Sequence, residues 1–348
     1  MYFHQMEIKL TSKEKLVLYG LARYPGLSDI DLASLIDVDR STIFKSKRKF
    51  RDWQLIRLLN VPAGGALGAE ILSVVFMRFS PGVGGRESIS EWILSPSCVY
   101  CIATATDAFS LVYSRNLTEF KKRAESILSG YRQNGVLEDF ICVHLCVELA
   151  SYQYNVPAAV SKIFGLDRRD VAPAPLSLMP MDALKLSEKD RLTLYAFVKY
   201  PNLSDLELSK RTGISRPTIS GKRSRFFDAN ILLREAHVEW ERICCELMCL
   251  YHIRMRQNVS YHDAGSLLSM MGSQLFCYMQ PGDVCGAILS SSFSDLKDGM
   301  DAFVNSAFER DLIDGRPYMV IMPLRSLKVL KLDYAPAVAE MLGIEKEI

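Results

Sequence analysis

The sequence lacks the features that would assign it to a membrane, to the secretory pathway or to the nucleotide-hydrolysing enzymes. No apolar run reaches the roughly 18 residues that a membrane-spanning helix needs. His4 and Glu7 lie where a signal peptide would have its apolar stretch. No Lys-Ser/Thr pair follows the glycines at 64–65 or 82–85, so a phosphate-binding loop is not indicated. We therefore expect a cytoplasmic protein that needs no cofactor.

Reactive side chains are also scarce or poorly arranged. Of the five histidines, His4, His237 and His262 have no serine, cysteine or carboxylate pattern around them that would indicate a nucleophile. The nine cysteines are odd in number and scattered through apolar segments, which is typical of reduced core residues and not of a disulfide framework.

Two cysteine groups have spacings that would also suit a metal or a redox pair. Cys98 and Cys101 are three apart, and Cys142, His144 and Cys146 alternate along one expected strand. In the sheet inferred below, the two groups would lie about 14 Å apart, on opposite edges. We predict no metal site and buried, reduced thiols. A thiol switch at Cys98, at a partly exposed strand end, is the alternative.

What the sequence does contain is a duplication. The segment from Lys9 to Asp52 recurs 176 positions later, from Lys185 to Asp228, with identical residues at 17 of 44 positions. Weaker similarity continues in the same register as far as residue 147. Self-similarity at a fixed period indicates repeated structural units, so the chain is interpreted as two copies of one unit, which suggests an internal pseudo-dimer.

The order of segments within the repeat predicts five parts. They are a winged helix at 1–66, a ferredoxin-like domain at 67–166, a proline-containing linker at 167–183, a second winged helix at 184–242 and a second ferredoxin-like domain at 243–348. An added C-terminal helix is expected in each copy, at 158–164 and 337–342. The fold class is therefore α+β, with a winged helix-turn-helix and a β-α-β-β-α-β domain occurring twice.

Each copy begins with signals for three short helices. Thr11 and Ser187 start capping boxes, the Tyr-Pro pairs at 24–25 and 200–201 end the first helix, and Ser28 and Ser204 cap the second. Asp39 and Ser215 are expected to cap the third. The apolar segments at 55–59 and 231–233 follow as strands of a wing.

The third helices are basic. Six cations and no acid lie between Arg40 and Arg51, whereas Ile43, Phe50 and Phe226 are expected to pack inward. Arginine suits a guanine edge, serine and threonine reach bases or phosphates, and lysine neutralises phosphates. Because so little acid accompanies these cations, we favour DNA as their partner. A winged helix used for protein contact is the alternative.

The third-helix segments DRSTIFKSKRKFRD and SRPTISGKRSRFFD resemble the recognition helices of Lrp/AsnC-type transcriptional regulators. Their pattern is a small polar cap, then Arg, Ser or Pro, Thr, a β-branched residue and a basic run. The resemblance implies sequence-specific binding to double-stranded DNA. The matching positions are Arg40, Ser41, Thr42, Lys45, Lys47 and Arg48 in the first copy and Arg216, Pro217, Thr218, Ser220, Lys222, Arg223 and Arg225 in the second.

The same resemblance implies a small-molecule effector, commonly an amino acid, at a glycine-containing turn before an aspartate. The corresponding residues are Asp107 and Asp283. Only the second copy has a glycine, Gly282, in this turn. Aspartates that simply hold their turns are the alternative explanation.

Siroheme decarboxylases also resemble Lrp/AsnC-type proteins, and fused pairs of about this length occur. An enzyme of tetrapyrrole metabolism is therefore the alternative function. We expect no enzyme, because no histidine lies near the strand at 98–104 and because such enzymes have no need of basic third helices.

Overall fold

The computed structural model describes residues 8–83, 87–166, 176–179, 186–243, 245–256 and 259–345. His4, Gly84, Gly85 and most of the expected linker lie outside these ranges. The chain forms two compact units, and each combines segments from both copies of the repeat. The first unit consists of Met1–Leu59, Tyr152–Leu176 and Arg234–Arg325. The second consists of Asn60–Ser151, Ser177–Leu233 and Ser326–Ile348. None of the described helices is long and apolar enough to cross a lipid bilayer.

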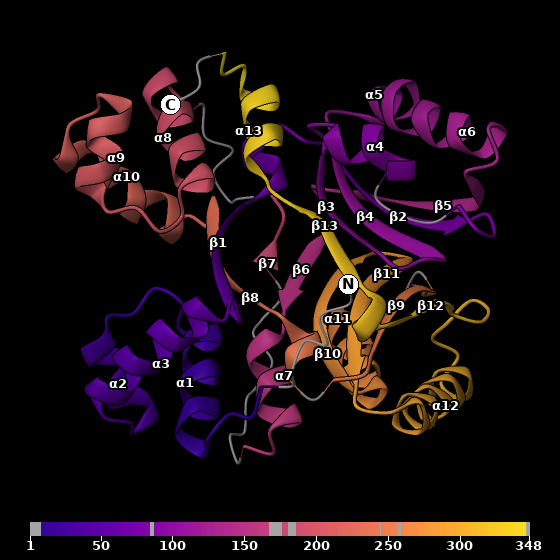
Figure 1. Cartoon of the computed structure of the whole chain (residues 1–348). Coiled ribbons are helices and arrows are strands. Elements are labelled where there is room, and N and C mark those ends of the chain that lie inside the picture. Colours follow the sequence, from indigo (N-terminus) through magenta and orange to yellow (C-terminus); the bar gives the residue numbers. More distant parts are fainter. Residues whose placement is uncertain are drawn as a thin grey trace. The chain divides into compact units, whose positions relative to one another are not determined.

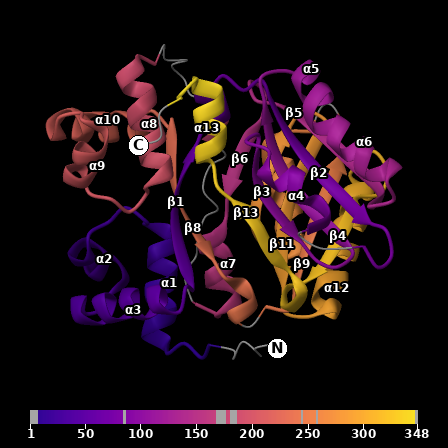
Figure 2. The same cartoon turned by 45° about the horizontal axis from the view of Figure 1, so that its top comes forward.

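Each unit contains one of the expected three-helix modules (Figure 2). Their helices are α1 (Ser12–Arg23), α2 (Asp29–Ile36) and α3 (Arg40–Asp52) in the first module and α8 (Glu188–Lys199), α9 (Asp205–Thr212) and α10 (Arg216–Asp228) in the second. Both predicted capping boxes, at Thr11 and Ser187, are present. The first helix of each module ends directly before its Tyr-Pro pair, at Arg23 in α1 and at Lys199 in α8. The capping and proline signals thus predicted the modules correctly.

The strand that follows each module pairs with its counterpart from the other copy. These strands are β1 (Ile56–Pro62) and β8 (Leu232–Val238), and together they form a two-stranded sheet. Ala63 N–H donates to the carbonyl of Ile231, and Glu239 N–H donates to that of Leu55. Both strands were expected, but the wing is built from the two copies together.

The second unit contains a ferredoxin-like sheet and its helices. The strands are β2 (Ile71–Phe79), β3 (Cys98–Ala103), β4 (Asp107–Ser114) and β5 (Leu137–Cys146). The helical segments are α4 (Ser90–Leu94), α5 (Leu117–Phe120), a π-helical turn (Lys121–Glu125) and α6 (Ser126–Gln133). The order β3-β4-β2-β5 is antiparallel throughout. This arrangement confirms the predicted β-α-β-β-α-β topology.

The first unit contains the corresponding sheet of the second copy. Its elements are β9 (Leu247–Arg254), α11 (Tyr261–Leu268), β10 (Ser273–Gln280), β11 (Asp283–Ser290), α12 (Phe293–Glu309) and β12 (Tyr318–Pro323). The order β12-β9-β11-β10 repeats that of the first copy. The core between this sheet and its helices includes Tyr251, Phe303 and Met271, and the equivalent core of the second unit includes Trp92, Phe120 and Leu128.

Both sheets are extended by a strand that comes from the other copy (Figure 1). The exchanged segments are β6 (Ser151–Tyr154) with α7 (Val156–Ile163), and β13 (Lys328–Leu332) with α13 (Ala335–Leu342). β6 and the two-residue β7 (Leu176–Ser177) follow β10, whereas β13 pairs antiparallel with β3. The C-terminal helices were expected, but these strands were not. The exchange covers an edge strand that would otherwise expose unpaired backbone groups.

Candidate nucleic-acid interface

Each third helix packs against its own module with an apolar side. Ile43 and Phe50 of α3 and Ile219 and Phe226 of α10 are fully buried. These residues are spaced seven apart, so they share one side of the helix. The predicted packing role of Ile43, Phe50 and Phe226 is confirmed.

Several cations of α3 are held by carboxylates of its own module. Lys47 Nζ lies 2.5 Å from Asp29 Oδ1, and Lys49 Nζ lies 2.5 Å from Glu14 Oε1. The other carboxylate oxygen of Glu14 accepts from the Thr11 amide in the capping box. Burial alone would raise the pKa of Glu14, but the hydrogen bonds from Lys49 and Thr11 outweigh it and lower the pKa. The sequence suggested that few acidic residues accompany the cations of α3. That expectation is wrong, because carboxylates from other helices of the module pair with two of them.

The second module has the corresponding ion pairs and an additional one from Lys222. Arg223 Nε lies 2.7 Å from Asp205 Oδ1, and both Lys222 and Arg225 contact Asp190 Oδ1. The Asp190 side chain is only 8% exposed and that of Lys222 13% exposed. Burial acts to raise the pKa of Asp190, but Lys222 and Ser187 lower it to about 2. These cations fasten α10 to α8 and α9.

The opposite side of each third helix faces solvent. On α3 the exposed residues include Arg40, Ser41, Phe44, Lys45, Arg48 and Arg51, and on α10 they include Arg216, Pro217, Thr218, Ser220, Gly221 and Ser224. Within the described residues, Arg40, Lys45, Arg51 and Arg216 make no ion pair. Arg48 Nε is 4.0 Å from Asp52 on an exposed turn. The first helix thus presents at least three uncommitted cations, and the second presents Arg216.

The expected caps of the third helices are in place, but they act differently. Asp39 and Ser215 occupy the N-cap positions, but neither side chain accepts a hydrogen bond from a helix amide. Lys13 Nζ donates to Asp39 over 3.0 Å instead, and the Ser215 hydroxyl is 2.8 Å from that of Thr218. The side-chain capping predicted here is wrong, because nearby side chains compete for both oxygens. Thr42 is half-buried.

Two outward residues of α3 were not predicted as site residues. Phe44 and Arg51 both point away from the module. Helical spacing gives a signal for Phe44, because it lies one turn from Arg40 and one turn from Arg48. Phe44 was nevertheless missed, because an aromatic side chain in a sequence rich in apolar residues is expected to be buried in a core.

The aspartates of the expected effector turns contact their own sheets. Thr106 donates to Asp107 Oδ2 over 2.6 Å, and Arg78 Nε lies 3.6 Å from Oδ1. Asp283 contacts Nε2 of His252 at 2.8 Å, which lowers its pKa despite partial burial. Gly282 has φ +90°, as the tight turn requires. A ligand carried by these aspartates would compete with these partners.

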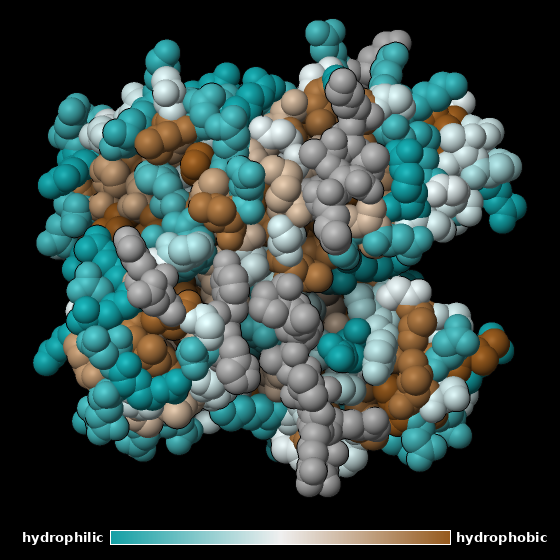
Figure 3. Space-filling model, turned by 180° about the vertical axis from the view of Figure 1, so that it is seen from behind, coloured by the Kyte–Doolittle hydropathy of each residue, from teal (hydrophilic) through white to brown (hydrophobic). Residues whose placement is uncertain are grey.

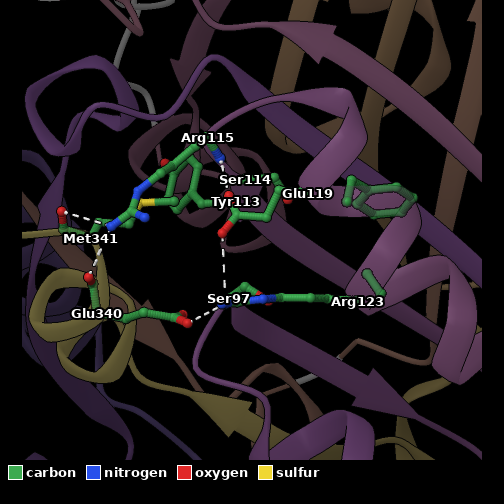
Figure 4. A pocket seen from close by; sticks show the side chains of 10 residues that line it. Ser97, Tyr113, Ser114, Arg115, Glu119, Arg123, Glu340 and Met341 are labelled. Atoms are coloured by element: carbon green, nitrogen blue, oxygen red, sulfur yellow. Dashed lines mark hydrogen bonds and ion pairs between the residues drawn. The ribbon is translucent and has the colours of Figure 1, made fainter.

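A small pocket in the second unit is where α13 is fastened (Figure 4). Arg115 donates to the carbonyls of Glu340 and Met341 at the end of α13. Arg123 forms an ion pair with the Glu340 side chain and lies 3.6 Å from Glu119. Cations at the C-terminal end of a helix also suit its dipole. The arginine donors seen in this pocket are directed at the chain itself.

The cysteine predictions have mixed outcomes. Cys98 and Cys101 are fully buried in the core under β3, and burial raises the pKa of Cys98 and raises that of Cys101 to about 11. A thiol switch would require Cys98 to be partly exposed. That prediction is wrong, since β13 and the helices cover this strand. Cys142 and Cys146 lie on β5, at the opposite edge of the repeat's sheet, as expected, but they are half-buried and not buried.

Comparison with known proteins identifies the fold. The siroheme decarboxylase NirDL matches with 10% identity over 95% of this chain and 99% of its own, with a TM-score of 0.51. AsnC from E. coli matches with 11% identity over 40% of this chain and 93% of its own, with a TM-score of 0.32. A transcriptional regulator from Neisseria meningitidis, in complex with L-Met, has 12% identity over 39% of this chain and 90% of its own, with a TM-score of 0.34. No family model and no curated protein matches the sequence. At these identities, the likeness to NirDL shows a common fold.

Proposed function

We propose that the chain is a sequence-specific, DNA-binding transcriptional regulator with two winged helices, and that it acts by binding and not by catalysis. The observation that carries this proposal is the division of the cations on α3. Lys47 and Lys49 hold carboxylates of their own module, whereas Arg40, Lys45 and Arg51 face solvent without an ion pair in the described part of the chain.

A helix-turn-helix places the exposed side of its third helix against the major groove. The uncommitted cations lie on that side, so they are available to phosphates and guanine edges. Lys47, Lys222, Arg223 and Arg225 contribute to the positive potential of the helix but would have to share their charge with Asp29, Asp190 and Asp205. The contacts to DNA are therefore assigned first to Arg40, Ser41, Lys45 and Arg48, and on α10 to Arg216, Pro217, Thr218 and Ser220.

The two third helices present different exposed residues, so the proposal includes two unlike half-sites. Selection of the full chain on a pool of random duplexes tests this directly. We expect enrichment of a bipartite sequence in which one half is bound more strongly, together with an affinity that falls steeply with salt. Absence of enrichment combined with a flat salt response would contradict DNA binding.

A small-molecule effector remains part of the proposal at Asp107 and Asp283. Calorimetry with a panel of amino acids would show heat in the wild type that is reduced by Asp283→Ala more than by Asp107→Ala. The reason is that only the turn before Asp283 has a glycine that allows close approach of a ligand to the backbone. Heat that is unchanged from the wild type in both variants, or absent with every compound, would leave the aspartates as turn residues.

The alternative is a tetrapyrrole enzyme, which is favoured by the likeness to NirDL over both copies of the repeat. Against it, His144 packs on Phe120 and contacts Ser73, whereas His252 is engaged by Asp283. Residues lining the pocket around α13 include neither histidine nor cysteine. Incubation with iron-uroporphyrin III followed by desalting tests the alternative, because a retained visible absorbance band would favour it.

A further inference from the structure

The outward side of α3 carries an exposed phenyl ring among cations. Phe44 is 63% exposed, and Ile43 and Phe50 already fill the inner side of the helix. Phe44 is therefore not needed for the core of its module. Arg40 lies one turn before it, Arg48 one turn after it, and Lys45 beside it on the same side. A polyanion attracted by these cations would meet the ring at the same place.

Other large apolar side chains also reach the surface, and Figure 3 shows apolar residues between hydrophilic ones on one face. Phe293, which is 60% exposed, is a useful contrast. It begins α12, and the acidic Asp295 follows in the same turn. What distinguishes Phe44 is therefore the positive charge around it and not its exposure.

A partner that suits Phe44 must offer anionic groups flanking an apolar one. The major groove of duplex DNA has this chemistry, since phosphates line its rims and the C5-methyl group of thymine projects from its floor. Phenylalanine is one of the side chains that contact this methyl group. Resting on the proposed DNA binding, we propose that Phe44 reads thymine methyl groups in the major groove.

The second copy has no equivalent reader. The position that corresponds to Phe44 is Ser220, whose hydroxyl offers a hydrogen bond and not an apolar surface. Thymine would therefore be distinguished by its methyl group mainly in the half-site that faces α3. This assigns a chemical origin to the difference between the two half-sites.

The test compares two duplexes that differ only in this methyl group. The full chain is titrated into alternating poly(dA-dT) and alternating poly(dA-dU) of equal length, which present the same phosphates. We expect the wild type to prefer poly(dA-dT) by about four-fold, the equivalent of one buried methyl-sized group. Phe44→Ser should abolish most of this preference, and Ser220→Phe should increase it.

Phe293→Ser serves as the matched control, because it removes an equally exposed ring elsewhere and should leave the preference unchanged. Phe44→Ser should unfold at the wild-type denaturant concentration, since the ring is outside the core. A preference that persists in Phe44→Ser, or equal binding of both duplexes by the wild type, would overturn methyl reading while leaving DNA binding intact. An equal loss of affinity for both duplexes in Phe44→Ser would also overturn it. Failure to bind either duplex would overturn the proposed function itself.

Discussion

The third helices α3 and α10 are alike on the side that faces their modules and different on the side that faces solvent. Inward, Ile43 and Phe50 match Ile219 and Phe226, and the ion pairs match as well. Lys47 with Asp29 corresponds to Arg223 with Asp205, and Lys49 with Glu14 corresponds to Arg225 with Asp190. Outward, Arg40 matches Arg216, but four other equivalent pairs differ: Ser41 and Pro217, Phe44 and Ser220, Lys45 and Gly221, and Arg48 and Ser224.

This difference separates two uses of positive charge that look identical in a sequence. A half-buried cation beside a carboxylate fixes a helix, and its loss leaves the carboxylate unpaired in a poorly solvated place. An exposed cation contributes little to stability and remains available to a partner. The two copies therefore share the charges that hold the helix, whereas of the charges that a partner would meet they share Arg40 and Arg216 and differ at Lys45 and Arg48.

The largest effect is expected from removing the exposed cations of α3. The triple variant Arg40→Ala, Lys45→Ala, Arg48→Ala should weaken DNA binding about 100-fold and reduce the salt slope by two to three, at roughly 0.9 per phosphate contact. Arg216→Ala should reduce the slope by about one. Titrations at several salt concentrations measure both, and Lys122→Ala on the ferredoxin-like domain is the control. Equal slopes in the triple variant and the control would mean that the exposed cations of α3 do not contact phosphates.

An effect on stability is expected when a carboxylate that anchors a third helix is removed. Asp190→Asn leaves Lys222 poorly solvated without a partner charge and should cost about 2–4 kcal/mol of the free energy of unfolding. Glu14→Gln should cost about 1 kcal/mol, because the Lys49 side chain is 37% exposed and can be solvated. Urea denaturation measures both values. If Glu14→Gln were the more damaging variant, the interpretation of the second module as the more tightly fastened one would be wrong.

The carboxylate of Asp190 should also make the stability of the chain depend on pH. The pKa of Asp190 is about 2 in the folded chain, against about 3.9 when unfolded. Because the folded pKa is the lower one, the stabilisation is present above about pH 4 and is lost as the pH falls towards 2. The difference in unfolding free energy between wild type and Asp190→Asn should therefore shrink by about 2 kcal/mol between pH 5 and pH 2. A difference that stays constant across this range would contradict the assignment.

The smallest effect concerns the outward side of α10. Gly221 is exposed in the helix interior, and a side chain there would meet open space. Gly221→Lys and Gly221→Ala should both stabilise the helix by up to about 1 kcal/mol, as measured by thermal unfolding. Only Gly221→Lys, which makes α10 resemble α3 at Lys45, should steepen the salt dependence of DNA binding, by about 0.9. The same slope in both variants would mean that this side of α10 does not approach phosphates.

Much of the fold could be predicted because its signals are local. The capping boxes at Thr11 and Ser187 gave the starts of the first helices, and the apolar segments gave the strands of both sheets. The strand expected at 98–104, for example, corresponds to β3 (Cys98–Ala103). Such signals depend on residues within a few positions of one another.

Non-local partners could not be predicted in this way. Glu14 and Lys49 are far apart in sequence, so six cations without an intervening acid suggested a free basic run. The repeat did contain a signal, since both copies keep a cation at Lys47 and Arg223 and an acid at Asp29 and Asp205. The strands β6 and β13 are short, and each joins a sheet of the other copy, so no neighbouring residues indicate their partners.

The exchanged strand β13 has a consequence for the order in which the molecule is made. Lys328 pairs with Ala103, so the sheet of the first copy is completed only by residues synthesised more than two hundred positions later. At about 5–20 residues per second, translation leaves the β3 edge without this partner for roughly 10 to 40 s. An uncovered strand edge is a template for pairing with other chains. Nascent chains are therefore most exposed to aggregation in this interval, which ends when β13 leaves the ribosome and pairs with β3.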